Sequence, residues 1–367
     1  MLNVLQIDGF RAFSQYAVED LGRVNLFVGR NNSGKTTILE AAEILLAPDS
    51  AAAVLGSAIR RGEMHVPRNQ DRPNQYADVS HLFHGHACEA GERFRISGTE
   101  SSSPLWLVCE VYTARSYPDG SRALFAEEDL TESWLALYIN HSRSNEEPVT
   151  LPMASSGAVP LDAVRRQRPK PNPEERPVSF VRTETLDTGK LREFWDTIAL
   201  TEEESSVTDS LRILEPRIEK IGFLATRSVR YGPSSEGIYL RLSGVEDRMP
   251  LGSLGDGVRH LLTLSLAVSR SRRGFVMIDE IDTGLHHSVM SDMWRVLIET
   301  AERLDVQVFA TTHSLDCVRS LAWLANTQPD LCKGVRMHRV DSERSKTVVY
   351  GPEEISIAAE QHVEMRG

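Results

Sequence analysis

The chain has 367 residues, of which 41% are hydrophobic, and its formal net charge is -11. This length predicts two domains, or one domain with a large insertion, around a substantial core. The acidic balance excludes a protein that coats nucleic acid with its whole surface and leaves only a local basic patch. The four cysteines, at positions 88, 109, 317 and 332, lack paired spacing, so we expect reduced, mostly buried thiols.

No segment of the sequence predicts a membrane contact. The first residues, MLNVLQIDGFRAF, lack the basic start and apolar stretch of a secretory signal. The longest apolar run, LLTLSLAV (261–268), is too short to cross a bilayer. We therefore expect a cytoplasmic protein.

Residues 1–46 predict two strands, a glycine-rich loop and a helix. NVLQIDGF alternates like a half-buried strand, RVNLFVG is an apolar run that ends at glycine, and TTILEAAEILL places apolar residues on one helical face. The loop GRNNSGKTT (29–37) fits the pattern G-x-x-x-x-G-K-[ST]. Its flanking strand and helix are those that a phosphate-binding loop requires.

Each part of this loop has a predicted role at a bound ATP. Backbone N–H groups of residues 32–36 would surround the β-phosphate at a helix N-terminus, where the helix dipole favours anions. Lys35 would bridge the β- and γ-phosphates, and the Thr36 hydroxyl would ligate Mg²⁺. The predicted nucleotide-binding residues of the loop are Gly29, Asn31, Asn32, Ser33, Gly34, Lys35, Thr36 and Thr37.

Between residues 48 and 180, short apolar runs such as WLVCEVYT and WLALYIN predict a β-rich lobe of undefined topology. RRQRPKPNPEERP (165–177) predicts an exposed linker, and contact of its basic half with a phosphate backbone is the weaker alternative. The histidines of SHLFHGH (80–86) lack matching cysteine or carboxylate spacing, which disfavours a metal site. Residues 186–222 predict a short helical arm that begins with an N-cap near TEEE or SVTDS and stops near Gly222.

The chain regains α/β order from GIYLRLSG onward. A strand, a glycine turn and an apolar helix near 258–270 precede the strand GFVMID. HSVMSDMWRVLIETAERL then predicts a helix, and VQVFATT predicts another strand. The apolar face of that helix comprises Met290, Trp294, Leu297, Ile298, Ala301 and Leu304.

Two acidic residues follow the buried strand 275–278. Asp279 at its tip would support Mg²⁺, and Glu280 would act as the general base that polarises the attacking water. Lys35 and Asp279 lie more than two hundred residues apart, which excludes small kinases and GTPases.

A second glycine-rich turn, SLGDGVRHLL, opens the helix before the acidic strand. Because a helix N-terminus binds anions and one chain holds one γ-phosphate, we expect this turn to cap ATP held by another copy. The predicted contacts of this turn are Gly255, Asp256 and Gly257. His313, at the end of the strand in FATTHS, would contact the γ-phosphate. The predicted catalytic residues are therefore Glu280, His313 and Lys35.

This order of motifs resembles the ABC-type ATPases, including the SMC and RecF proteins. Within them, GRNNSGKTT, IDEIDTGLH and ATTHS resemble the OLD-like ATPases of bacterial phage defence, also called AAA15 or AAA21. The resemblance covers residues 1–46 and 224–316. It implies a Walker A loop at 29–37, Walker B at Asp279 and Glu280, a D-loop at 282–285 that adds Asp282 to the ATP contacts, and a switch histidine at His313.

The sequence departs from these families at three places. LGDGV (254–258) has Gly255 where the signature LSGGQ has a serine, so Ser253 is a nearby substitute. Asn32 occupies a position where RecF-like loops have glycine. No Q-loop is assigned, with Gln75 and the SHLFHGH stretch as the two candidates.

We expect an α/β, ABC-type P-loop NTPase core with a mixed sheet, an inserted β-rich lobe and a short helical arm. The expected division is 1–180, 181–223, 224–320 and a tail at 321–367 packed on the core.

The resemblance implies a slow ATPase that forms a homodimer or higher oligomer around ATP and Mg²⁺. About fifty residues follow His313, too few for the Toprim nuclease domain of OLD proteins, so we expect a separate nuclease or toxin effector. DNA is a further candidate partner. The alternatives are a RecF-like DNA repair protein and, more weakly, a transporter ATPase.

Overall fold

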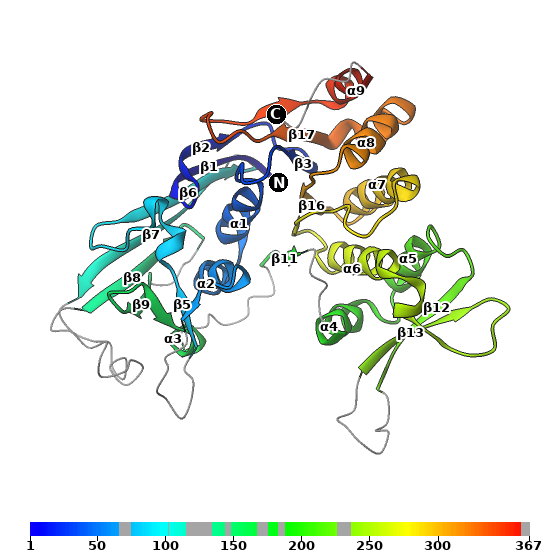
Figure 1. Ribbon diagram of the computed structural model, residues 1–367, viewed down its shortest axis with the longest axis horizontal. Coiled ribbons are helices and arrows are strands. Elements are labelled where there is room, and N and C mark those ends of the chain that lie inside the picture. Colours follow the sequence, from blue (N-terminus) through cyan, green and yellow to red (C-terminus); the bar gives the residue numbers. More distant parts are fainter. Residues whose placement is uncertain are drawn as a thin grey trace. The chain divides into compact units, whose positions relative to one another are not determined.

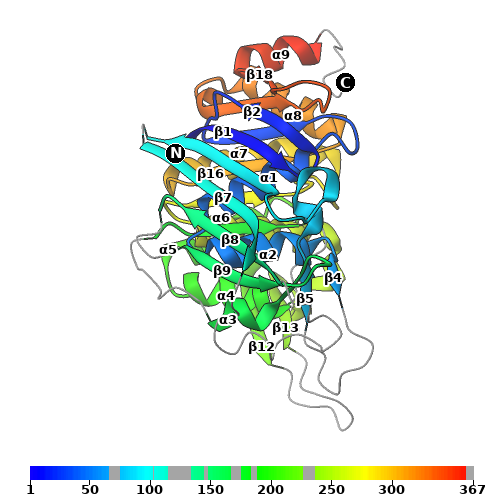
Figure 2. The ribbon, with the colours of Figure 1, turned by 90° about the vertical axis from the view of Figure 1, so that its left-hand side faces the viewer.

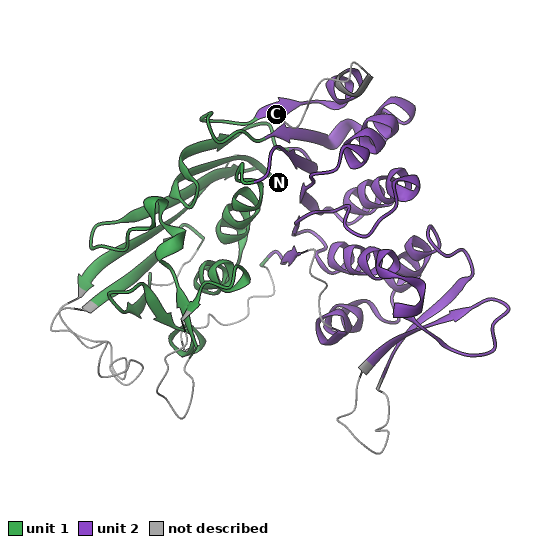
Figure 3. Ribbon diagram, viewed as in Figure 1, with its two compact units in different colours: residues 1–21, 32–175, 340–347 green, residues 22–31, 176–339, 348–367 purple. Residues whose placement is uncertain are grey.

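Two compact units divide the chain (Figure 3). Unit 1 comprises Met1–Leu21, Asn32–Glu175 and Val340–Thr347, and unit 2 comprises Gly22–Asn31, Arg176–Arg339 and Val348–Gly367. The computed structural model describes residues 1–65, 75–101, 103–114, 134–143, 148–166, 175–182, 188–225 and 236–360.

Unit 1 is built on an antiparallel sheet with the strand order β2-β1-β6-β7-β8-β9, and Figure 2 shows these strands face-on. Every second or third residue of β1 is buried, as expected for a strand with one face on a core. The strands are β1 (Leu2–Phe10), β2 (Phe13–Val18), β6 (Arg93–Glu100), β7 (Ser103–Ala114), β8 (Trp134–His141) and β9 (Val149–Met153). The prediction of a β-rich lobe is confirmed.

The helices of unit 1 include two that the sequence did not predict, the second and the third. α1 (Lys35–Leu46) packs on β1, β6 and β7, and α2 (Ser50–Arg60) packs beside it. Asp49 caps α2 by accepting a hydrogen bond of 2.9 Å from the backbone N–H of Ala52. The remaining elements are α3 (Leu161–Arg166), the 3-10 turns η1 (Ser80–Leu82) and η2 (His84–His86), and a small sheet β10-β5-β4 of Ala158–Pro160, Tyr76–Asp78 and Met64–His65.

An ion pair between Glu43 and Arg60 joins α1 to α2. Burial raises the pKa of Glu43 to about 7, although Arg60 opposes the shift. Because the pKa is raised in the folded state, this group favours folding below its ordinary pKa and loses that contribution as pH rises through 7.

We predict a pH-dependent stability difference between the wild type and Glu43→Gln. The wild type should lose about 2 to 3 kcal/mol of unfolding free energy relative to the variant between pH 5 and pH 8, because only the wild type must ionise a buried carboxyl. Urea denaturation at both pH values measures this difference. Parallel pH profiles of the two proteins would contradict it.

Unit 2 is an α/β layer structure around a mixed sheet with the order β11-β15-β16-β3-β17-β18 (Figure 1). Five strands are parallel and β18 is antiparallel to β17. Every residue of β3, β15 and β16 is buried, which explains their continuous apolar runs. The strands are β3 (Val24–Val28), β11 (Val178–Val181), β15 (Phe275–Ile278), β16 (Gln307–Thr311), β17 (Val335–Arg339) and β18 (Val348–Tyr350).

Six helices described in unit 2 share one core with this sheet. Trp294 is fully buried there, and its indole N–H donates a hydrogen bond of 3.1 Å to the carbonyl of Cys317. The helices are α4 (Thr188–Ile198), α5 (Glu202–Leu211), α6 (Asp256–Arg270), α7 (His287–Arg303), α8 (Leu315–Thr327) and α9 (Pro352–Glu360), with the 3-10 turns η5 (Leu251–Leu254) and η6 (Leu331–Gly334). The predicted fold class is confirmed.

The helical prediction for 186–222 is only partly right. Thr201 caps α5 as expected, by accepting a hydrogen bond from the backbone N–H of Glu203. The helix ends at Leu211, however, and β12 (Ile218–Ala225) begins a small sheet with β13 (Glu236–Leu242) and β14 (Met249–Pro250). Pairing with β13 makes 218–222 a strand rather than the last helical turns.

The cysteine prediction is confirmed: all four are free thiols, and three of them are buried. Among the described residues, no helix combines the length and apolar character that a bilayer span requires. Of the predicted linker 165–177, residues 167–174 lie outside the described residues.

Candidate nucleotide site

Three neighbouring parallel strands of unit 2 end at the predicted site residues. Gly29–Asn31 follow β3, Asp279 and Glu280 follow β15, and Thr311 ends β16. Since the strand order is β15-β16-β3, these segments emerge at one edge of the sheet. Ligands of open α/β sheets bind outside this carboxyl edge.

The phosphate loop connects β3 of unit 2 to α1 of unit 1, so the chain itself joins the two units here. Asn32 has φ 62° and Gly34 has φ 99°, both in the left-handed region. Asparagine tolerates this conformation better than most residues, which explains how a non-glycine residue is accommodated at position 32.

The N-terminus of α1 is suited to an anion. Its N-cap is Gly34, which supplies no side-chain hydrogen bond to the first turn. Lys35 opens the helix and is only 5% exposed, and Ser33 and Thr37 are also buried. The helix N-terminus, its dipole and the lysine that opens it together favour a phosphate at this position.

Thr311 organises the acidic pair, a role that the sequence reasoning missed. Its hydroxyl donates a hydrogen bond of 2.7 Å to the Asp279 carboxylate and accepts one of 2.8 Å from the backbone N–H of Glu280. Supporting bonds of this kind orient metal-binding carboxylates, so Asp279 fits its predicted role toward Mg²⁺. The signal was present in FATTHS, where only the histidine was assigned.

Glu280 has a strained backbone with φ 55°. Non-glycine residues in this region cluster at functional sites, where surrounding contacts hold them. Here the flanking N–H of Ile281 donates to the carbonyl of Thr311 at 3.0 Å. The His313 Nε2 lies 3.9 Å from Glu280 Oε1, and both side chains are partly exposed. Unit 2 therefore brings the predicted base and the predicted switch histidine together.

The predicted signature turn contacts the predicted D-loop. Gly255 (φ 88°) is the N-cap of α6 and gives no side-chain cap. A Cβ on Gly257 would lie 2.8 Å from the carbonyl oxygen of Gly284, so only glycine permits this approach. The His260 Nε2 lies 2.9 Å from the carbonyl oxygen of Ile281 and, since burial lowers the pKa of His260, the neutral ring donates this bond.

Asp282, in the predicted D-loop, is also held in place. Thr312 donates a hydrogen bond of 2.5 Å from its hydroxyl to the Asp282 carboxylate. Ser253, Gly255 and Asp256 are exposed next to this anchored loop. The sequence reasoning missed the anchors Thr312 and His260, which carry no motif signal of their own.

The predicted site residues are thus divided between the units. Asn32, Ser33, Gly34, Lys35, Thr36 and Thr37 belong to unit 1. Gly29, Asn31, Gly255, Asp256, Gly257, Asp279, Glu280, Asp282 and His313 belong to unit 2. The predicted Mg²⁺ ligands Thr36 and Asp279 therefore lie one in each unit.

The histidine-rich stretch does not form a metal centre of three ligands. His81 and His86 meet through Nδ1 atoms 3.2 Å apart, whereas His84 Nδ1 contacts the carbonyl oxygen of Arg11. Across the described residues, no group of three or more histidine, cysteine, aspartate or glutamate side chains could hold a metal. Gln75, the other Q-loop candidate, is exposed.

Two sequence families match parts of the chain. Residues 1–84 match the family described as "AAA ATPase domain". Residues 139–317 match the family described as "AAA domain, putative AbiEii toxin, Type IV TA system". These segments contain the phosphate loop, the signature, the acidic pair and His313.

Individual proteins are similar at low identity. A Helicobacter pylori protein named ATP/GTP phosphatase is 20% identical over 350 residues, which cover 88% of this chain and 87% of that protein. An SMC head bound to the C-terminal winged-helix domain of ScpA shares 13% identity at a TM-score of 0.47, with 96% and 98% of the chains covered. The Thermotoga maritima SMC head domain shares 15% identity at 0.43, with 95% and 98% covered.

The family matches fall on the same segments that carry the site geometry, and the confirmed fold supplies the sheet on which such a site is built. An ATPase of this class uses ATP together with Mg²⁺. The chain is a P-loop ATPase in which two segments match AAA domain families.

Proposed function

We propose that two ATP-bound copies pair head to tail, so that the signature of each covers the γ-phosphate held by the other. The dimer is cytoplasmic and serves as a sensor or scaffold for a separately encoded nuclease or toxin in antiphage defence. ATP hydrolysis ends the paired state.

The dimer proposal is supported mainly by the predicted signature of unit 2, which is exposed and is held in place by contacts with the neighbouring loop. Ser253, Gly255 and Asp256 are exposed, and α6 behind them begins without a side-chain cap. Such a helix N-terminus offers unpaired N–H donors to an anion. The contacts of Gly257 with Gly284 and of His260 with Ile281 transmit any displacement of the signature to the loop that follows Glu280. When the signature of one copy contacts the ATP held by the other copy, the position of Glu280 in the first copy therefore changes as well.

The chemistry follows from the side chains present. Lys35 and the first N–H groups of α1 hold the phosphates, and Thr36 with Asp279 would hold Mg²⁺, which neutralises charge on the transferred phosphoryl group. Glu280 accepts a proton from the attacking water, and His313 lies close enough to orient it or to contact the γ-phosphate. The name of the H. pylori relative, ATP/GTP phosphatase, supports hydrolysis as the outcome.

The defence role is supported by the resemblance of the loop to OLD-like ATPases and by the family description that names a toxin of a type IV TA system. The family description applies the toxin name to the matched domain itself, so it supports the defence setting, and the separate effector is inferred from the resemblance to OLD-like ATPases alone. The proposed partner is another protein, and DNA is a further candidate partner.

We predict that Ser253→Arg prevents ATP-dependent pairing while ATP still binds. The added cation and bulk lie on the exposed signature turn, away from the phosphate loop of the same copy along the chain. Light scattering after gel filtration of the Glu280→Gln background with ATP should show dimers, and the added Ser253→Arg should return it to monomers. Cells carrying the gene with its neighbours should lose phage resistance with Ser253→Arg.

The matched control is Ser205→Arg, an exposed serine on α5 of the same unit, which should leave pairing and resistance unchanged. If the Glu280→Gln protein remains monomeric at saturating ATP, the proposed pairing of two copies around ATP is wrong. Unchanged phage plating, combined with preferential ATP-dependent binding to gapped DNA, would replace the defence role with the RecF-like one.

A further inference from the structure

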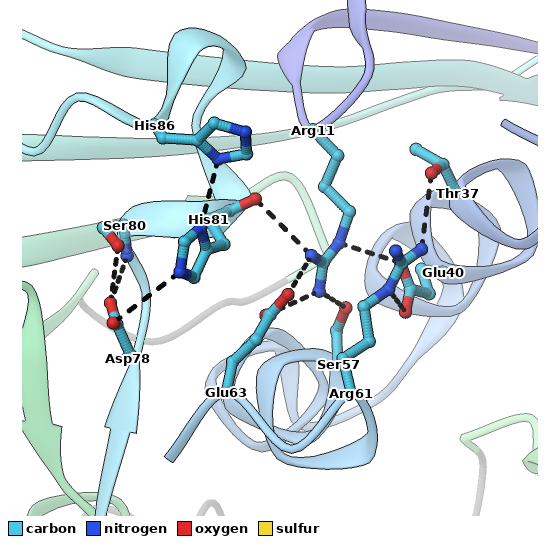
Figure 4. Close-up of polar contacts among 10 residues, drawn as sticks. All are labelled: Arg11, Thr37, Glu40, Ser57, Arg61, Glu63, Asp78, Ser80, His81 and His86. Atoms are coloured by element: carbon cyan, nitrogen blue, oxygen red, sulfur yellow. Dashed lines mark hydrogen bonds and ion pairs between the residues drawn. The ribbon is translucent and has the colours of Figure 1, made fainter. Parts of the chain in front are cut away.

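Two arginines from different elements of unit 1 converge on one glutamate of α1 (Figure 4). Glu40 lies one helical turn after Thr37, and its side chain is only 2% exposed. Arg11 comes from the turn between β1 and β2, and Arg61 is the C-cap of α2. Burying a carboxylate is costly unless it is paired, so these arginines determine where this turn of the helix can lie.

Arg11 is held rigidly. Its φ of 50° is left-handed, and its backbone N–H donates to the carbonyl of Leu82 at 2.9 Å. Its guanidinium forms an ion pair of 2.8 Å with Glu40, and donates to Glu63 at 2.8 and 3.1 Å and to Ser57 at 3.0 Å. A strained residue with this many partners is a fixed support for α1 rather than a mobile side chain.

Arg61 links the same glutamate to the phosphate loop. Its Nε and Nη2 donate to the two oxygens of Glu40, each at 2.9 Å, which is the planar, two-pronged geometry that lysine cannot reproduce. Its Nη2 also lies 3.4 Å from the Thr37 hydroxyl oxygen. Thr37 is the last residue of the loop and stands directly beside Thr36, the predicted Mg²⁺ ligand.

The first residue of β2 supports the loop at a second point. A Cβ on Gly34 would lie 2.2 Å from the Phe13 ring, so this ring packs directly on the loop backbone. Phe13 in turn stacks on Tyr16 with ring centroids 4.2 Å apart. The first turn of α1 is therefore buttressed at Gly34 by Phe13 and at Thr37 and Glu40 by Arg61 and Arg11.

We propose that Arg61 is a positioning residue for nucleotide binding, which acts through Thr37 and Glu40 on the first turn of α1. It sets the direction of the N–H groups and the Thr36 hydroxyl that receive the phosphates and Mg²⁺. The inference rests on the ATPase activity alone and requires neither the dimer nor the defence role.

The chain supplies its own control for a merely structural role. Arg60, the neighbour of Arg61, pairs with Glu43 one turn further along α1. Both arginines join the end of α2 to α1 and are about equally exposed, at 23% and 34% of their side chains. Of the two, it is Arg61 that has a contact with Thr37, so a difference between their variants isolates the effect on the phosphate loop.

The test compares Arg61→Gln, Arg61→Lys and Arg60→Gln in the full chain. Fluorescent ADP titration and ATPase kinetics should show the Kd and the KM for ATP raised about tenfold in Arg61→Gln, with kcat changed less, because a charge-assisted support is lost. Arg61→Lys should fall between Arg61→Gln and the wild type. Arg60→Gln should bind nucleotide like the wild type, while its melting temperature falls at least as far.

Equal rises in Kd for the two glutamine variants, or none in either, would show that Arg61 only holds the helices together. If Arg61→Gln does not fold, the lysine variant gives the answer, since wild-type affinity in it would overturn the proposal. If the wild-type protein binds nucleotide but does not form dimers, the dimer proposal is wrong and the proposal for Arg61 is unaffected.

Discussion

Glu280→Gln should bind ATP as the wild type does and lose turnover by at least a hundredfold, the usual scale for removing a general base. Glutamine keeps the size and the backbone of Glu280 but cannot accept the proton of the attacking water. Because hydrolysis ends the paired state in the proposed cycle, the variant should also accumulate as an ATP-bound dimer. Phosphate release under saturating ATP measures the first effect, and light scattering measures the second.

Glu302→Gln is a suitable control, because Glu302 is an exposed residue of α7 and should change neither quantity. Wild-type turnover in Glu280→Gln would assign the base to another residue. His313 would be the next candidate, since its Nε2 is 3.9 Å from the Glu280 carboxylate. Loss of both binding and turnover would instead mean that the strained turn at Glu280, with φ 55°, needs the carboxylate to hold its shape.

The parts of the site that sequence reasoning predicted are those with a local signature. The phosphate loop needs particular residues at fixed spacing, and a fully buried parallel strand such as β15 appears as a continuous apolar run ending in acids. Asn32 is informative for the same reason, because φ 62° restricts the residues allowed there.

The supporting residues could not be predicted in this way, because their partners are distant in the sequence. Thr311 meets Asp279 only because β15 and β16 pair in the sheet, and Arg61 meets Glu40 only because α2 folds back along α1. Even the burial of Glu40 is invisible in TTILEAAEILL, where the glutamates read as the polar face of the helix. In the large sheet of unit 1, the pairing of β1 with β6 is long-range in the same way, whereas the other pairs join consecutive strands.

The two units also differ in how well the periodicity of apolar residues predicted their helices and strands. From α6 to β17 of unit 2 the strands and α-helices alternate, so each apolar run defines one element and the α/β order follows. The segment 218–222 is the exception, because its strand is set by pairing with β13 rather than by its own sequence. The sequence analysis did not predict α2, although its apolar residues share one helical face and Asp49 provides a capping signal.

Lys35→Ala should lower the affinity for ATP by a hundredfold or more and abolish pairing, in contrast to Glu280→Gln, which keeps both. Hydrogen bonds to charged groups contribute about 1.5–3 kcal/mol each, and Lys35 is predicted to serve both the β- and the γ-phosphate. Its burial strengthens the effect, because a side chain only 5% exposed faces little competing water. The control is Lys346→Ala, which removes an exposed lysine paired with Glu19 and should bind ATP normally. Titration of both variants with fluorescent ATP analogues then separates the loss of the phosphate contact from the loss of one positive charge. Tight binding by Lys35→Ala would place the phosphates elsewhere than at the N-terminus of α1, and the roles of Thr36, Arg61 and the signature would then have to be reassigned together.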